Sequence, residues 1–331
     1  MKELVGLIPN ATWTPSSITF PPTLLLSTSS PMGVTVTNSG SVALSITGIG
    51  FTGINAGEFL QTNTCGSVSP NGTCTINVSF RPAGLGTRGA FLVFNTNDPN
   101  HLNISIQLSG TGTGPVAVLS PITVSFVNQL VGTTSTAQTV TLTNAGSAGS
   151  TLTINTKTIT GANAGDFAQT NTCGASLTAG ASCTFSVTFK PTAVGSRGAT
   201  LSVGTSDPVS PTVTTQLTGT GIAPVASVSP TLLNFGNQKQ QTTSAAQTVT
   251  LSNTGTATLT ISSIAIGGPN AGDFSRTTTC GATLAAGSNC TISVKFKPTK
   301  KGARTATLTI TDNSNAVATS QQNVSLNGTG Q

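Results

Sequence analysis

A five-residue motif that returns at a nearly constant interval constrains the fold more than any other feature of this sequence. Asn55–Phe59 reads Asn-Ala-Gly-Glu-Phe, and it returns with Asp in place of Glu at Asn163–Phe167 and Asn270–Phe274, at offsets of 108 and 107 residues. Other landmarks keep the same step, namely Phe80–Pro82, Phe189–Pro191, Phe296–Pro298, Gly86–Arg88, Gly195–Arg197 and Gly302–Arg304. Self-similarity at a fixed period indicates tandem copies of one unit. The 331 residues therefore form three copies.

Each copy reads as a sandwich of short strands. In the third copy Ile292, Val294 and Phe296 alternate with polar residues, and turn signals such as Asn253–Gly255 separate several such runs. Charged residues are only 6% of the chain, whereas disordered chains usually carry high net charge. We predict an all-β chain of three tandem immunoglobulin-like β-sandwich domains with about seven strands each. The predicted boundaries are a leader at 1–8 and domains at 9–112, 113–221 and 222–331.

The landmarks, taken together, resemble a known family. The Asn253–Gly255 turn, Asn270–Phe274, the Cys280/Cys290 pair, Phe296–Pro298 and the closing Gly328–Gly330 are similar to bacterial choice-of-anchor D repeats. Those repeats are relatives of Hydin-type domains in the PapD and major-sperm-protein branch of immunoglobulin-like folds. The resemblance implies exported, surface-attached modules without a catalytic motif. Copy one departs from it at Phe20–Pro22, which replaces the Phe-Gly-Asn-Gln of Phe235–Gln238.

The six cysteines fall as one pair per copy, at Cys65/Cys74, Cys173/Cys183 and Cys280/Cys290. We expect each pair to form a disulfide that closes a loop of roughly ten residues and contributes about 2.7 kcal/mol. Reduced structural thiols are the alternative. A zinc site would need four N or S ligands, and the chain contains only one histidine, His101. Disulfides predict an oxidising compartment, and hence an extracellular or cell-surface location.

The acidic residues argue against catalysis. Six of the seven recur at two repeat positions, Glu58/Asp166/Asp273 and Asp98/Asp207/Asp312. General acid–base chemistry needs converging groups, whereas a single acid in a turn motif is expected to accept backbone hydrogen bonds. We therefore predict no enzyme, no catalytic residue, no cofactor and no metal site, and we interpret His101 as a loop residue beside Asp98.

Basic residues are concentrated in copy three, which has seven Lys and Arg against two acids and so carries +5 of the formal charge of +6. Five of them form a candidate contact patch: Lys295, Lys297, Lys300, Lys301 and Arg304. The patch is either a solvated loop or a surface for an acidic polymer. Nucleic acid is not expected as a partner, because the only aromatic residue within the patch is Phe296, which the alternation directs inward.

The leader is apolar and short. Leu4, Val5, Leu7 and Ile8 occupy the place where an earlier domain's last strand would lie. They are either a remnant of a longer array or tail, or an assembly strand that pairs with a neighbouring copy. No stretch is long enough to span a bilayer.

These features favour a structural rod or filament that lies outside the cell and has other copies or neighbouring immunoglobulin-like domains as partners. The alternatives are an adhesin or carbohydrate-binding array, for which Trp13 is the only tryptophan, and a phage virion appendage or decoration protein.

Overall fold

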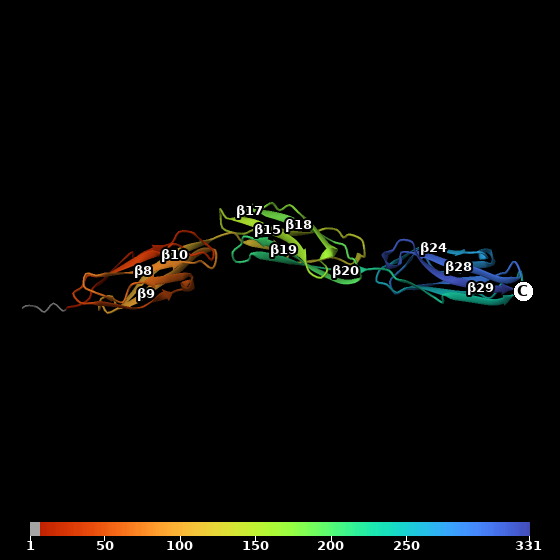
Figure 1. The fold of residues 1–331 in the computed structure, drawn as a ribbon, viewed down its shortest axis with the longest axis horizontal. Helices are drawn as coiled ribbons and strands as arrows, with labels where there is room; N and C mark the ends of the chain where they lie inside the picture. Colours follow the sequence, from red (N-terminus) through yellow and green to blue (C-terminus); the bar gives the residue numbers. More distant parts are fainter. Residues whose placement is uncertain (1–6) are drawn as a thin grey trace, which may run out of the picture.

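A computed structural model describes residues 7–331 and shows three β-sandwich domains arranged end to end (Figure 1). Each domain packs a four-stranded sheet against a second sheet of five or six strands. The all-β, three-sandwich prediction is confirmed. Domain 1 consists of β1–β10, domain 2 of β11–β20 and domain 3 of β21–β29.

In domain 1 the first sheet has the order β1-β4-β8-β6 and the second β2-β10-β9-β5-β7, with β3 also beside β10. The strands are β1 (Ala11–Thr14), β2 (Ser17–Thr19), β3 (Thr23–Leu24), β4 (Met32–Asn38), β5 (Leu44–Thr52), β6 (Phe59–Asn63), β7 (Ser67–Val68), β8 (Thr73–Phe80), β9 (Gly86–Thr96) and β10 (Asn103–Thr113).

Domain 2 repeats this topology strand for strand. Its strands are β11 (Ala117–Ser120), β12 (Thr123–Ser125), β13 (Gln129–Leu130), β14 (Gln138–Asn144), β15 (Thr151–Thr160), β16 (Phe167–Asn171), β17 (Ser176–Thr178), β18 (Ser182–Phe189), β19 (Gly195–Thr205) and β20 (Thr212–Ile222).

Domain 3 differs only in joining the second and third strands into one, β22. Its strands are β21 (Ala226–Ser229), β22 (Leu232–Gln238), β23 (Gln247–Asn253), β24 (Leu259–Gly267), β25 (Phe274–Thr278), β26 (Thr283–Leu284), β27 (Asn289–Phe296), β28 (Gly302–Asp312) and β29 (Ser320–Gly330). The helices are single 3₁₀ turns, η1 (Ala56–Glu58), η2 (Ala164–Asp166), η3 (Ala271–Asp273) and η4 (Ser314–Ala316).

The strand count exceeds the expected seven for two reasons: the first strand of each domain is divided between the two sheets, and a further short strand (β7, β17 or β26) joins the second sheet. In domain 1, β1 pairs with β4 of the first sheet, and after the cis Thr14–Pro15 bond β2 pairs with β10 of the second. Pro121 and Pro230 stand at the same place in the other domains, also after cis bonds. The second half is broken again in domains 1 and 2, into β2 and β3 on either side of Phe20–Pro22 and into β12 and β13.

Three phenylalanines form the centre of each core. In domain 3, Phe274 and Phe296 stack at 4.9 Å between ring centroids, and Phe235 lies 5.8 Å from Phe296. The last strand approaches this cluster closely, because a Cβ on Gly328 would lie 2.5 Å from the Phe296 ring. Gly110 and Gly219 approach Phe80 and Phe189 in the same way, so the closing Gly-Thr-Gly lets the last strand pass over an aromatic ring.

Candidate functional site: domain ends, their clamps and junctions

Three of the repeated motifs meet in one cluster at the C-terminal end of each domain, which we call the acid clamp. In domain 3 the clamp consists of Asp273, Thr299 and Arg304. One Asp273 carboxylate oxygen accepts hydrogen bonds from the Thr299 backbone N–H at 3.1 Å and hydroxyl at 2.7 Å, and the other lies 2.5 Å from Arg304 Nε. Asp166, Thr192 and Arg197 form the same clamp in domain 2.

Domain 1 has a weaker clamp. Glu58 replaces aspartate and Ala83 stands where the others have threonine. The Glu58 carboxylate lies 3.5 Å from Arg88 Nε, and its buried Oε2 has no hydrogen-bond partner among the described residues. The backbone bonds match the other domains: the Arg81 N–H donates to the Glu58 carbonyl at 2.7 Å, and the Glu58 N–H donates to the Asn55 carbonyl at 3.0 Å.

The clamps change the acidity of their carboxyl groups. Burial would raise the pKa of Asp273, but the hydrogen bonds from Thr299 and Arg304 outweigh it and hold the pKa below its ordinary value. The pKa of Asp166 is lowered in the same way, against its burial, by Thr192 and Arg197. Asp166 and Asp273 are therefore ionised and held in place, and their role is structural.

The second repeated acid shapes a turn at the opposite end of each domain. Asp98 Oδ1 accepts from the Asn100 N–H, and Oδ2 accepts from the Ala11 N–H, both at 2.9 Å. His101 Nδ1 lies 2.8 Å from the same Oδ2. Burial would raise the pKa of Asp98, but these hydrogen bonds outweigh it and lower the pKa. In domain 3 the Asp312 carboxylate accepts from the Ser314 N–H, and the Ser314 hydroxyl takes over the bond to Ala226 N–H.

A buried asparagine in each domain was missed by sequence reasoning, which interpreted Asn253–Gly255 only as a turn. Asn253 is 1% exposed and makes four hydrogen bonds. Its Oδ1 accepts from the Val225 and Gly255 N–H groups, and its Nδ2 donates to the Ala257 and Leu284 carbonyls. Asn38 and Asn144 do the same in domains 1 and 2. The repeated Asn-x-Gly was the available signal.

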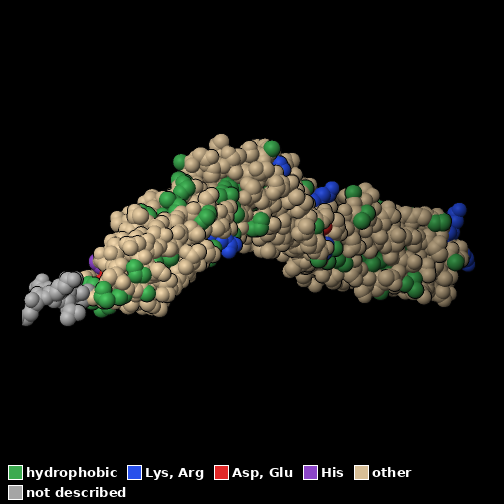
Figure 2. Space-filling view, turned by 60° about the vertical axis from the view of Figure 1, so that its left-hand side comes forward, with side chains coloured by type: hydrophobic (Ala, Val, Ile, Leu, Met, Phe, Trp, Pro, Cys, Tyr) green, Lys and Arg blue, Asp and Glu red, His purple; other side chains and the backbone are tan. Residues whose placement is uncertain are grey.

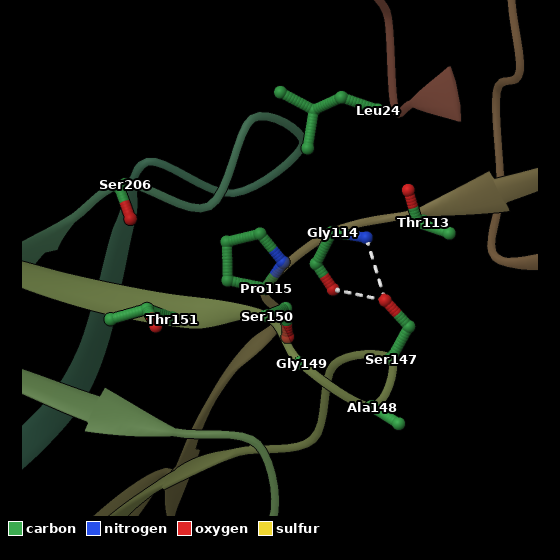
Figure 3. Close-up of a pocket in the computed structure, with 10 residues that line it drawn as sticks. All are labelled: Leu24, Thr113, Gly114, Pro115, Ser147, Ala148, Gly149, Ser150, Thr151 and Ser206. Carbon is green, nitrogen blue, oxygen red and sulfur yellow. Dashed lines mark hydrogen bonds between the residues drawn. The ribbon is translucent and has the colours of Figure 1, made fainter. Parts of the chain in front are cut away.

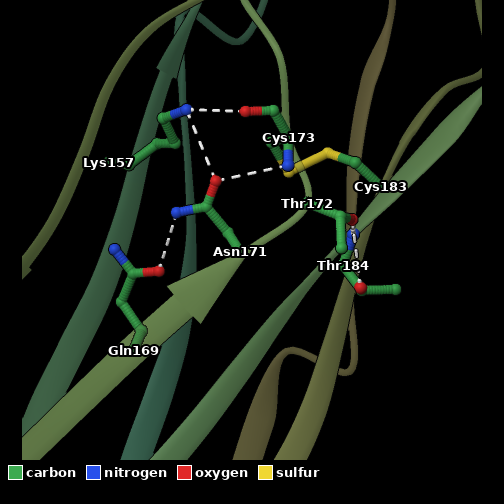
Figure 4. The surroundings of a disulfide bond; sticks show 7 residues. All are labelled: Lys157, Gln169, Asn171, Thr172, Cys173, Cys183 and Thr184. Carbon is green, nitrogen blue, oxygen red and sulfur yellow. Dashed lines mark hydrogen bonds between the residues drawn. A yellow bond between two sulfur atoms is a disulfide. The ribbon is translucent and has the colours of Figure 1, made fainter.

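The disulfides join Cys65 to Cys74, Cys173 to Cys183 and Cys280 to Cys290. Each bond connects the end of an edge strand to its neighbour in the first sheet and encloses the short strand that crosses to the second sheet, such as β7, which pairs with β5. In domain 2, Lys157 Nζ donates to the Cys173 carbonyl at 2.9 Å and Asn171 Oδ1 accepts from the Cys173 N–H (Figure 4). Each disulfide therefore stabilises the connection between the two sheets.

The junctions between domains are short and hydrogen-bonded. Three residues separate β10 from β11, and the first of them, Gly114, exchanges hydrogen bonds with the Ser147 hydroxyl, which accepts from the Gly114 N–H at 2.9 Å and donates to the Gly114 carbonyl at 3.4 Å (Figure 3). The Gly114 carbonyl also accepts from the Ser147 N–H at 3.0 Å. Leu24 of domain 1 lies over this linker, and a Cβ on Gly114, whose φ is +152°, would lie 3.1 Å from it. Leu24, Pro115 and Ser206 line an open cleft of ≈ 470 Å³ at the junction.

The linker between domains 2 and 3 is held in the same way. Ala223 N–H donates to Thr256 Oγ1 at 3.2 Å, and the Ala223 carbonyl accepts from the Thr256 N–H at 2.8 Å. Asn315 donates its backbone N–H to the Pro224 carbonyl at 2.7 Å. Each linker is thus built into the domain that follows it.

The predicted basic residues separate into two groups. Lys297, Lys300 and Lys301 are exposed at the far end of domain 3, and Lys295 lies on β27, opposite Ser275 of β25. Arg304 is only 15% exposed and pairs with Asp273, so it belongs to the acid clamp. Figure 2 shows Lys and Arg side chains gathered at this end of the molecule.

Trp13 and His101 are neighbours at the start of domain 1. Their rings are 5.4 Å apart and nearly perpendicular, and they line a shallow cavity of ≈ 240 Å³. Within residues 7–331 no group of three or more His, Cys, Asp or Glu side chains is placed to hold a metal ion. In the same range no helix has the length and apolarity needed to cross a membrane.

The proposed assembly strand falls partly outside the described residues, which exclude Leu4 and Val5. Leu7 and Ile8 are 73% and 44% exposed. Ile8 is equivalent to Gly114 and Ala223 of the linkers. Its carbonyl accepts a hydrogen bond from the Ser41 N–H, just as theirs accept from the Ser147 and Thr256 N–H groups. Whether this segment pairs with another copy stays a prediction.

Each domain matches a different family model. Residues 224–331 match Cep192 domain 4, residues 115–213 match the domain described as abnormal spindle-like microcephaly-associated, ASPM-SPD-2-Hydin, and residues 26–111 match the HYDIN/CFA65/VesB-like, Ig-like domain. A search of curated proteins gives no match.

Solved structures match the chain at low identity and low TM-score. A protein of unknown function from Porphyromonas gingivalis W83 is 14% identical, with 63% of this chain and 99% of that one covered and a TM-score of 0.28. The human CEP192 PapD-like domain 7 is 19% identical, with 32% and 87% covered and a TM-score of 0.26. Protocadherin gamma B7 extracellular cadherin domains 1–4 are 10% identical, with 96% and 76% covered and a TM-score of 0.39. Likeness at this level carries no functional argument, whereas the three family matches, one per domain, support a Hydin-like immunoglobulin-fold family for the chain.

Proposed function

We propose that this chain is a non-catalytic structural element of the cell exterior, a stiff rod that spaces or builds a surface structure. The observation that carries the proposal is the construction of the two junctions. A linker of three residues whose N–H and C=O groups are bonded to the next domain leaves few free backbone torsions. Such domains hold a fixed orientation to each other better than domains on a flexible linker.

Two further features support the proposal, the first its location outside the cell and the second its lack of catalysis. Each domain has a disulfide, and disulfides persist mainly in oxidising compartments. The acidic residues that could have acted in catalysis are instead hydrogen-bonded within clamps and turns. We extend this proposal to the finer assignment, an exported bacterial array of the choice-of-anchor D kind, with copies of itself or neighbouring immunoglobulin-like domains as partners.

An adhesive role is the second candidate, and one observation favours it. The only tryptophan and the only histidine lie together at the start of domain 1, where an aromatic ring could stack on a sugar. A stalk that presents domain 1 would combine both roles.

Electron microscopy of material from the native source, together with thiol labelling before and after reduction, tests the structural proposal. We expect stiff rods, or filaments built from them, attached to cells, with all six cysteines reactive only after reduction. Flexible strings of beads, or reactive thiols in unreduced protein from the source, would contradict it.

A further inference from the structure

The far end of domain 3 differs chemically from the matching ends of domains 1 and 2. One turn at this end begins with Leu24 in domain 1, Leu130 in domain 2 and Lys239 in domain 3. These positions are equivalent because two residues later the backbone N–H donates to the carbonyl of Pro82, Pro191 or Pro298. The turns read Leu-Leu-Leu, Leu-Val-Gly and Lys-Gln-Gln.

A second turn at this end changes in the same way. Gly84-Leu85 of domain 1 and Ala193-Val194 of domain 2 correspond to Lys300-Lys301. The equivalence rests on the last strand, where a Cβ on Gly112, Gly221 or Gly330 would lie 2.1 to 2.2 Å from the carbonyl oxygen of Gly84, Ala193 or Lys300. Apolar residues therefore occupy these two turns in domains 1 and 2, and lysines stand at the equivalent of Leu24 and Leu85 in domain 3.

The structure brings the two turns together. The Gln241 N–H donates to the Pro298 carbonyl and the Gln240 N–H to the Gln331 carbonyl, both at 3.0 Å, so the turns flank the end of β29. We call the exposed Lys239, Lys297, Lys300 and Lys301 the basic end (Figure 2). Sequence reasoning missed Lys239, which is about 60 residues from the others along the chain.

No acidic side chain of domain 3 compensates the charge of the basic end. Asp273 and Asp312 are the only acids of domain 3, and they are 4% and 2% exposed. Asp273 is already neutralised by Arg304, and Asp312 lies at the other end of β28. Four exposed ammonium groups without a nearby exposed Asp or Glu side chain produce a positive potential beyond the surface.

We propose that the basic end binds an acidic polysaccharide. Lysines on adjacent turns attract spaced anionic groups, and the exposed amide of Gln241 can hydrogen-bond to hydroxyl groups of the polymer. A nucleic acid would favour stacking aromatics, but Phe274 and Phe296 are buried. Binding to a bilayer would favour apolar side chains that insert beside the charges, and here the equivalents of Leu24 and Leu85 are lysines.

Binding of the full chain to immobilised alginate, a polymer of uronic acids, tests the proposal in low and moderate salt. The test variant is Lys239→Gln/Lys300→Gln/Lys301→Gln. The matched control, Lys190→Gln/Arg276→Gln/Lys295→Gln, removes the same charge at exposed positions elsewhere. Far-UV circular dichroism and thermal melting check that both variants are folded.

We expect the wild-type chain and the control to bind alginate with dissociation constants within about threefold of each other, and the test variant to bind about tenfold or more weakly. Added salt should weaken the wild type more steeply than the test variant. Equal loss in both variants, or no alginate binding by the wild type in low salt, would overturn the proposal. Tighter binding to a mixed-sequence oligonucleotide or to vesicles of phosphatidylglycerol and phosphatidylcholine would assign the basic end to another partner class, and so also overturn it.

Discussion

The three acid clamps differ in strength, and this difference can be measured inside one chain. Replacing Asp273 by Ala leaves the Arg304 guanidinium and the two Thr299 donors without their acceptor. Removing one partner of a buried ion pair costs about 3 to 5 kcal/mol. Because the Arg304 side chain is 15% exposed and can regain water, we expect the lower value, about 3 kcal/mol.

The matching change in domain 1, Glu58→Ala, should cost much less. The pair is 3.5 Å apart, and Arg88 is 24% exposed. Weakly coupled pairs of this kind contribute about 1 kcal/mol or less. The two substitutions should therefore differ by about 2 kcal/mol in the free energy of unfolding of their own domains.

Hydrogen exchange of the full chain, followed by mass spectrometry, measures both effects. The most protected amides of β27 and β28 should exchange about 150-fold faster in Asp273→Ala, and those of β8 and β9 about fivefold faster in Glu58→Ala. Thr277→Ala, at an exposed position of β25, is the control and should change exchange in domain 3 less than about twofold.

The reverse experiment supplies the missing groups. Glu58→Asp/Ala83→Thr gives domain 1 the clamp residues of domain 3 and should slow the exchange of β8 and β9. Equal effects of Asp273→Ala and Glu58→Ala, or no gain from the double substitution, would refute the assignment of clamp strength to the carboxylate–threonine–arginine geometry.

Three further predictions concern stability. Asn253→Ala should destabilise domain 3 by about 3 kcal/mol, because two backbone N–H groups and two carbonyls lose their partner. Asn327→Ala, at an exposed position of β29, should change the stability of domain 3 by less than about 0.5 kcal/mol. Denaturant titration of both variants measures the two free energies of unfolding. The lowered pKa values of Asp98, Asp166 and Asp273 stabilise the fold above the unfolded pKa of about 3.9, and this stabilisation is lost as pH falls through the folded values. Melting temperatures should therefore decrease when the pH is lowered below about 4. Asp273→Asn should make this decrease smaller in domain 3, and an unchanged pH profile in that variant would count against the clamp. Cys173→Ser/Cys183→Ser should lower the stability of domain 2 by about 2.7 kcal/mol, with the other two domains unaffected in calorimetry.

Much of the fold could be predicted because the sequence contains the same pattern of strands and turns three times. Alternation in segments such as Ile292–Phe296 indicates strands, and the closing glycines mark where the last strand meets a phenylalanine. The division of the first strand between two sheets could not be predicted, since it depends on which neighbour each half finds after Pro15, Pro121 or Pro230.

The candidate site was predicted less completely. Lys300 and Lys301 are neighbours in the sequence and so appear as one group, but Lys239 reaches the same end only through the pairing of β22 with β29. Arg304 was assigned to the patch because its bond to Asp273 spans 31 residues and leaves no local pattern. The buried Asn253 resembled an ordinary turn residue because its partners lie on three separate segments.

Small-angle X-ray scattering of the full chain tests the central claim, that the three domains form a stiff rod. Strands of 11 residues at about 3.3 Å per residue make each domain about 36 Å long, so the rod should reach a maximum dimension of roughly 120 Å. A Gly-Ser insertion of six residues between Thr113 and Gly114 should make the chain flexible, and the same six residues appended after Gln331 should not. A wild-type profile already as flexible as that of the insertion variant would contradict the account.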